Sequence, residues 1–251
     1  MKRFILLLGG LLLFPCAPAQ EAPLPSNEKE LTTLDMPQWL IEFSNLPGDQ
    51  RENYLRNFAQ AKVAFQEGKW TQCYSHLANC ELIFNKNPNV WNLRASCLME
   101  QKFFDEAAAE LQKALQAMPH DPVTVLNLAS LHMATGQYEK SIEVIDELWL
   151  RLPEDSPTEL TDVLTYRKLL ATIQLGRLDE AKKLISHVNA LSDTPLYYYS
   201  RAAISLAEGN KQEAARCLRI VKRIFTKGNT LVPYQRALEL SRLGTTSETP
   251  H

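Results

Sequence analysis

A short turn motif recurs along the chain at almost constant intervals, and this recurrence restricts the fold more than any other feature. The motif occupies residues 68–70, 102–104, 136–138, 176–178 and 209–211. Successive copies are 34, 34, 40 and 33 residues apart. All copies but the second begin with glycine, which readily adopts the left-handed backbone conformation at the end of a helix. A period of this length predicts repeated units, each burying its apolar face against its neighbours.

The residues on both sides of each turn show helical periodicity. In the second unit, Pro88 suits the first position of a helix, because its missing N–H would have no partner there. Apolar residues then recur at helical spacing before the turn (Trp91, Ala95, Leu98) and after it (Ala107, Leu111, Ala114). The unit is therefore predicted to be a helical hairpin of two helices, each about 14 residues long.

This pattern resembles the tetratricopeptide repeat (TPR). The matching residues are Trp91, Ala95, Ala107, Leu111 and Pro119 in the second unit; Leu128, Ala129, Gly136, Tyr138, Ile145 and Pro153 in the third; Gly176, Ala181 and Ile185 in the fourth; Tyr198, Ala202, Gly209, Ala214 and Leu218 in the fifth; and Ala61, Gly68, Trp70 and Leu77 in the first. Arg94 and Leu98 depart from the family's usual Leu and Tyr. The resemblance implies an all-α fold, a right-handed α-solenoid of about five TPR hairpins over residues 49–230. Residues 231–243 are expected to form a C-terminal capping helix.

The 40-residue step reflects a local insertion after Pro153. Ser156 and Glu159 have the spacing of a capping box, with Pro157 at the first helical position. The following helix is therefore predicted to start early without changing the phase of the repeats.

The ends of the chain have a different composition. Residues 1–19 combine Lys2 and Arg3 with an apolar run and the small residues of 17–19, as expected for a secretory signal peptide that is cleaved before Gln20. Lipidation of Cys16 is the alternative. Residues 20–48 are expected to form a flexible tether followed by a short apolar helix, and 244–251 a disordered tail.

Charge and motifs argue against several classes of function. The formal net charge is −2, and no basic stripe with interleaved aromatic residues indicates a nucleic-acid partner. The histidines lack metal-ligand spacing, and no nucleophile elbow or phosphate-binding loop is present. The acidic pairs 105–106 and 179–180 open second helices, where they complement the helix dipole. We therefore expect no catalytic residues, metal site or cofactor.

The cysteines show no tight disulfide framework. Cys73 and Cys80 are seven residues apart on one predicted helix, about 10 Å along its axis, which excludes a disulfide between them. Both are expected to be small core residues. A bridge from Cys80 to Cys97 on the adjacent helix is left open.

The resemblance implies that the first helix of each hairpin lines a concave surface. Eight residues are predicted to form a partner-binding groove there: Phe58, Phe65, Leu126, Met133, Tyr166, Leu170, Ile173 and Tyr199. An exposed apolar surface of this size usually marks a partner site. The alternative is that tight curvature or the segment around Trp39 covers it. Some members of this family hold a terminal carboxylate of their partner with Lys, Arg and Asn side chains from successive first helices. Here Phe58 and Leu126 stand where such polar residues would be expected, which leaves chiefly Lys62 and Asn127. That binding mode is therefore disfavoured.

The sequence thus favours a non-catalytic scaffold or adaptor in the bacterial cell envelope, in the periplasm or associated with the envelope, that holds an apolar helix or peptide. No later apolar run is long enough to span a membrane. One alternative is a lipid-anchored assembly factor for an outer-membrane or pilus machine. Another is an accessory domain of an enzyme complex.

Overall fold

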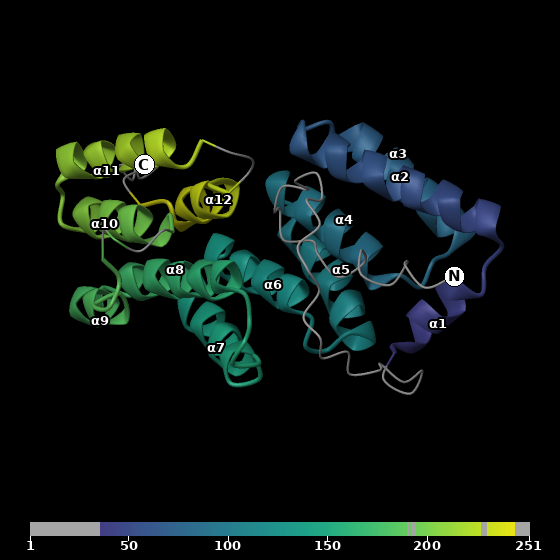
Figure 1. Cartoon of the computed structure of the whole chain (residues 1–251), viewed down its shortest axis with the longest axis horizontal. Helices are drawn as coiled ribbons and strands as arrows, with labels where there is room; N and C mark the ends of the chain where they lie inside the picture. Colours follow the sequence, from purple (N-terminus) through teal and green to yellow (C-terminus); the bar gives the residue numbers. More distant parts are fainter. Residues whose placement is uncertain (1–35, 190, 192–193, 227–229, 244–251) are drawn as a thin grey trace. The chain divides into compact units, whose positions relative to one another are not determined.

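The computed structural model describes residues 36–189, 191, 194–226 and 230–243. Every regular element within these residues is an α-helix (Figure 1). The helices are α1 (Gln38–Ser44), α2 (Gly48–Gln66), α3 (Trp70–Ile83), α4 (Pro88–Glu100), α5 (Phe104–Ala117), α6 (Pro122–Ala134), α7 (Tyr138–Trp149), α8 (Thr158–Gln174), α9 (Leu178–Leu184), α10 (Leu196–Ala207), α11 (Lys211–Ile224) and α12 (Val232–Ser241). The predicted all-α fold of helical hairpins is confirmed. The predictions for 1–19, for the first part of the tether and for 244–251 lie outside the described residues.

The chain divides into two compact units that separate after Asn127, within α6. The N-terminal unit contains α1 to α5 and the first half of α6. The C-terminal unit contains the rest of α6 and the helices up to α12. Each unit is described by itself below.

Within the units, helices that follow one another in sequence pack as antiparallel pairs: α2 with α3, α4 with α5, α8 with α9, and α10 with α11. Ser141 at the start of α7 donates a hydrogen bond to the carbonyl of Ala129 in α6, 2.9 Å away. The predicted stripe on α5 is fully buried at Ala107, Leu111 and Ala114. Small side chains here let helices approach closely, so the repeat phase assigned from the sequence agrees with the buried faces.

Each hairpin turn contains one residue in the left-handed conformation. Glycine occupies this position in four hairpins, and Lys102 occupies it in the α4–α5 hairpin with φ of 66°. The hydrogen bonding is nevertheless the same: the Phe103 N–H donates to the Leu98 carbonyl at 2.9 Å, as the Gln137 N–H does to the His132 carbonyl at 2.7 Å. The turn geometry therefore holds where the sequence motif lacks its glycine, and a side chain there carries a conformational cost.

The short helix α1 belongs to the N-terminal unit. Its Phe43 ring packs edge-on against Tyr54 of α2 and against Phe84 after α3, with centroid separations of 4.8 and 5.6 Å. Trp39 is also buried. The short apolar helix expected near the end of 20–48 therefore forms and packs against the first hairpin.

The capping box predicted after Pro153 is wrong. Pro157 precedes the first residue of α8 and no side chain caps that helix. The Ser156 hydroxyl instead donates to the Pro153 carbonyl at 2.7 Å, which closes a local turn. A serine hydroxyl can hydrogen-bond either to the start of a helix or to a nearby backbone carbonyl, and Ser156 makes the second kind of bond.

The left-handed position allows a direct test of the turn. Lys102→Gly should stabilise the chain by about 0.5–1 kcal/mol, because glycine adopts a positive φ without steric strain. Gly136→Lys should destabilise it by about 1–2 kcal/mol, although a Cβ at Gly136 would meet no atom within 4 Å. Urea unfolding followed by circular dichroism measures both changes. Opposite signs are expected, and equal signs would contradict this account of the turn.

Candidate functional site

The eight predicted groove residues are all buried in this structure. Phe58 of α2 stacks on Tyr54, with ring centroids 6.4 Å apart. Phe65 of α2 packs at 5.8 Å against Trp70, which opens α3. Among the described residues, these eight do not present an open apolar surface, and their binding of a partner stays a prediction. The contacts are clearest for the groove residues on α8 and α10, described next.

A cluster of three tyrosines joins α8, α10 and α12. The Tyr166 ring lies 5.7 Å from Tyr199 and 5.4 Å from Tyr234, and Tyr199 stacks on Tyr234 at 5.1 Å, measured between centroids. Leu170 and Ile173, on the same helix as Tyr166, are buried as well. Burial raises the pKa of all three hydroxyls, that of Tyr199 to about 12. The cluster is therefore a neutral, packed core.

The sequence had assigned the cover of this face to a partner, to tight curvature or to the Trp39 segment. For Tyr166 and Tyr199, α12 provides the contact instead, and a hydrogen bond from the Gln174 side chain to the Ser241 carbonyl ties α12 to the end of α8. The segment 231–243 was expected only to cap the last hairpin. Its apolar residues Tyr234 and Ala237 were the available signal, because a helix with a buried face must dock somewhere.

The N-terminal unit carries a row of polar side chains on α4 and α6, here called the amide row: Asn89, Asn92, Ser96 and Asn127. The three α4 members follow one another at spacings of three and four residues, so they share one face of the helix. The Asn127 side-chain amide donates to the Asn92 carbonyl oxygen Oδ1 at 2.9 Å and to Ser96 Oγ at 3.1 Å. Asn127 lies 35 residues after Asn92, one repeat later. The row therefore links equivalent helices of successive hairpins.

One donor in this row has no acceptor. The side-chain nitrogen Nδ2 of Asn92 is buried and lacks a hydrogen-bond partner within the described residues. The residue is 1% exposed, whereas Asn127 at the end of the row is only half-buried. A buried N–H without an acceptor costs about 1–3 kcal/mol, which makes this donor unusual among buried amides. The sequence indicated Asn127 as a polar residue of this surface but did not predict its hydrogen bond with Asn92.

On another face of α4, Arg94 joins three helices. Its guanidinium contacts Glu81 of α3 and reaches Glu110 of α5 at 3.4 Å. Glu110 also accepts from Lys113 at 2.6 Å and is almost fully buried. The residue that departs from the family's usual leucine thus forms a charge network between hairpins, which a leucine cannot do.

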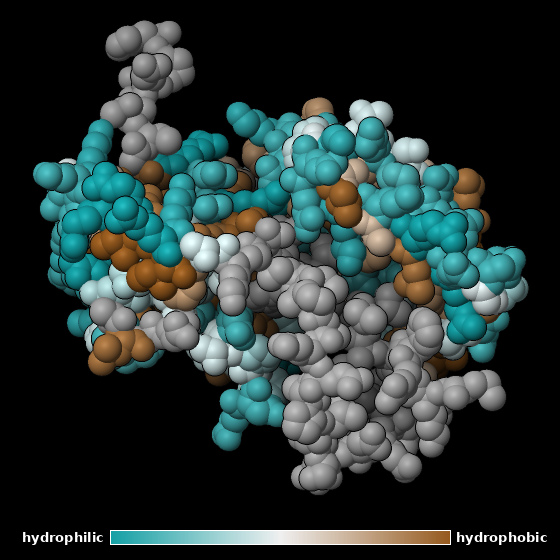
Figure 2. All heavy atoms as spheres, turned by 45° about the horizontal axis from the view of Figure 1, so that its top comes forward, coloured by the Kyte–Doolittle hydropathy of each residue, from teal (hydrophilic) through white to brown (hydrophobic). Residues whose placement is uncertain are grey.

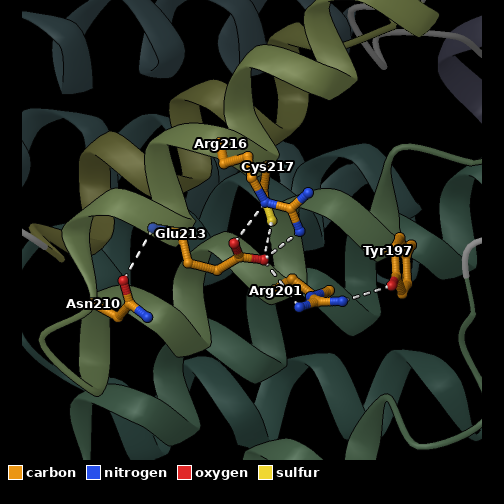
Figure 3. A network of polar contacts seen from close by, with 6 residues as sticks. All are labelled: Tyr197, Arg201, Asn210, Glu213, Arg216 and Cys217. Carbon is orange, nitrogen blue, oxygen red and sulfur yellow. Dashed lines mark hydrogen bonds and ion pairs between the residues drawn. The ribbon is translucent and has the colours of Figure 1, made fainter.

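Figure 3 shows a further polar network, on α10 and α11. Glu213 accepts hydrogen bonds from Arg216 at 2.7 and 2.9 Å and from Arg201 at 3.0 Å. Arg201 also donates to the Tyr197 hydroxyl at 2.9 Å, and Asn210 caps α11 by accepting from the Glu213 N–H at 3.0 Å. All of these contacts lie within α10, α11 and the turn between them, so the network stabilises this hairpin.

No described group of three or more His, Cys, Asp or Glu side chains could hold a metal ion. No described helix is both long and apolar enough to cross a membrane. On the face drawn in Figure 2, hydrophilic side chains predominate among the coloured residues, and the apolar ones form separate small patches. The amide row, with its unpaired donor, is the candidate functional site.

The Glu213 network predicts a pH dependence of stability. The hydrogen bonds from Arg216, opposed by desolvation, lower the pKa of Glu213 to about 2, below its ordinary 4.5. Because its pKa is lowered by folding, the Glu213 carboxylate contributes fully to stability above pH 4.5, and this contribution is lost as the pH falls toward 2. Melting temperatures between pH 7 and 2.5 should therefore fall less steeply for Glu213→Gln than for the unaltered chain. Glu106→Gln, an exposed carboxylate on α5, is the control and should keep the steep fall.

Comparison with known proteins supports the repeat pattern. Residues 98–158 match the family model described as Tetratricopeptide repeat. A tetratricopeptide repeat and J domain-containing co-chaperone from Fusarium oxysporum f. sp. lycopersici is 32% identical over 84 residues. That match covers 33% of this chain and 16% of the co-chaperone. Among solved structures, a tetratricopeptide repeat protein from Parabacteroides merdae gives a TM-score of 0.49 at 16% identity, covering 76% of this chain and 73% of that one.

Proposed function

We propose that this chain is a non-catalytic scaffold that binds a segment of another protein along the amide row. The unpaired amide donor of Asn92, buried beside Asn127 and Ser96, carries the proposal. An asparagine side chain offers both a donor and an acceptor, as a peptide group does. An extended peptide alternates these groups along its backbone, so asparagines on successive hairpins suit it.

The binding mode differs from the one that the sequence favoured. An apolar helix would need the groove side chains of α8 and α10 to be free, and there the Tyr234 ring already packs against them. A peptide held by its backbone needs amides rather than apolar anchors. Lys62 of α2 is exposed and stands over the Phe58 ring, 5.6 Å from its centroid, so it is available to an acidic group of the partner.

Site-specific photocrosslinking in native cells tests the proposal. A photoreactive amino acid at Met99, which follows Ser96 on the same face of α4, should give a discrete crosslinked partner. The same amino acid at Ala108, exposed on α5, should not. Asn92→Ala combined with Asn127→Ala should weaken binding of that partner about tenfold or more, because two hydrogen-bonding groups are lost. Asn79→Ala, an exposed asparagine on α3, is the matched control.

Two results would count against the amide row: crosslinking at position 108 alone, or undiminished binding by the double variant. Circular dichroism melting of each variant separates loss of binding from loss of folding. If the double variant folds and still binds the partner, the binding surface must lie elsewhere on the chain.

We infer from the leader-like residues 1–19 that the chain acts outside the cytoplasm, in the bacterial cell envelope. Mass spectrometry of the mature N-terminus tests this placement. A chain that begins at Gln20 is expected, and one that retains Met1 would overturn it. An acyl group on Cys16 would instead favour a lipid-anchored assembly factor, the second candidate that the sequence supports.

A further inference from the structure

The structure divides the cysteines of its described part into one pair and two single residues. The sulfurs of Cys73 and Cys97 are 3.1 Å apart, and both residues are fully buried. The Cys80 thiol instead donates to the Tyr54 carbonyl at 3.6 Å, and the Cys217 thiol donates to Glu213 at 3.6 Å. The sequence left a Cys80–Cys97 bridge open, but in the structure the sulfur next to Cys97 is that of Cys73.

The pair stands where two hairpins meet. Cys73 lies in the first turn of α3, which is the second helix of the first hairpin. Cys97 lies in the last turn of α4, which is the first helix of the second hairpin. One repeat later, 34 residues on, the equivalent positions hold Ala107 and Leu131, both buried. Cys73 and Cys97 thus occupy ordinary packing positions of the repeat, and in this pair of hairpins both positions hold cysteine, with the two sulfur atoms in contact.

We propose that Cys73 and Cys97 form a disulfide that joins the first hairpin to the second when the chain folds in the presence of a disulfide oxidant. Glutathione disulfide is sufficient, and the disulfide of an exported thiol oxidase is the equivalent in a cell envelope. The bond would enclose the segment from α3 to α4, with its ends 24 residues apart in sequence.

The chemistry is a two-step exchange. The Cys73 thiolate attacks one sulfur of glutathione disulfide, forms a mixed disulfide and releases one glutathione thiolate. The Cys97 thiolate then attacks the Cys73 sulfur and releases the second glutathione. The two cysteines are oxidised by two electrons in total, the oxidant is reduced to two thiols, and the two cysteine protons pass to the released thiolates through solvent.

In the folded chain, the surroundings of Cys73 and Cys80 shift the pKa values of their thiols in opposite directions. The hydrogen bond with Cys97 lowers the pKa of Cys73, burial opposes this shift, and the Arg94 guanidinium adds to it. Burial raises the pKa of Cys80 to about 12, and the nearby Glu81 carboxylate acts in the same direction. The thiolate form is therefore less disfavoured at Cys73 than at Cys80 on the same helix.

Full burial also sets when the bond forms. Neither sulfur of the pair is open to a bulky oxidant in the folded state, so exchange takes place while α3 and α4 come together or when they separate. Once formed, the disulfide is shielded from reductant by the same packing. The proposal does not depend on the amide row or on a partner.

Peptide mapping identifies the bond directly. The full chain is refolded with reduced and oxidised glutathione, free thiols are blocked with N-ethylmaleimide, and trypsin is applied without reductant. Cys73 and Cys80 both fall in peptide 70–86, and Cys97 falls in peptide 95–102. We expect a 70–86/95–102 crosslink that persists in Cys80→Ser and disappears in Cys73→Ser. Absence of the crosslink in the unaltered chain, or its persistence in Cys73→Ser, would overturn the proposal.

Thermal melting gives a second readout. Refolding the chain in dithiothreitol instead of the glutathione mixture should lower its melting temperature by about 5 °C or more, because without the bond no closed loop restricts the unfolded chain. Cys80→Ser should show the same shift, and Cys73→Ser and Cys97→Ala should show none. A shift of equal size in all four chains would mean that dithiothreitol acts elsewhere, and would reject this bond. Since no partner is involved, neither result bears on binding by the amide row.

Discussion

The fold depends on a chain reversal that one residue in the left-handed conformation makes possible. At each turn between paired helices, this residue lets the following N–H reach a carbonyl five residues back, as Phe103 does to Leu98. Without the reversal, the buried stripes on paired helices, such as Ala107 and Leu111 on α5, could not face their partners. Lys102 shows that the turn is imposed by the packing around it, since this hairpin keeps the geometry without glycine.

The sequence predicted the hairpins well because their information is local and repeated. The turns, the fully buried Ala107 and Ala114, and the start of α4 at Pro88 all follow from spacing within one unit. The position of α12 does not, because a terminal helix can dock on any exposed apolar surface and its own residues do not say which. The same reason explains the cysteines: helix spacing excluded Cys73–Cys80, but only the packing of α3 on α4 selects between Cys73 and Cys80 as the neighbour of Cys97.

The candidate site illustrates the limit of reasoning from apolar pattern. Residues such as Tyr166 and Tyr199 were assigned to a groove because the periodicity shows only that they point away from the hairpin core. Their contact with Tyr234 comes from a helix 35 residues beyond Tyr199, which no local pattern connects to them. Polar residues carry the opposite signal: a buried amide such as Asn92 must be satisfied, and an unpaired donor is therefore more informative than an apolar side chain.

The helices outside the repeat pattern perform different tasks in the two units, and this affects where binding can occur. In the N-terminal unit, α1 covers the first hairpin through Phe43, while Arg94 with Glu81 and Glu110 links the hairpins by charge. None of these contacts uses the face of α4 that carries Asn92. In the C-terminal unit, α12 uses the inner residues of α8 and α10 for its own packing. That helix therefore occupies apolar side chains of α8 and α10, whereas in the N-terminal unit the Arg94 network and the amide row lie on different faces of α4. A partner that bound at the amide row, as proposed, would leave the Arg94 network and the packing of α1 in place, whereas a partner that bound at Tyr166 and Tyr199 would have to displace α12.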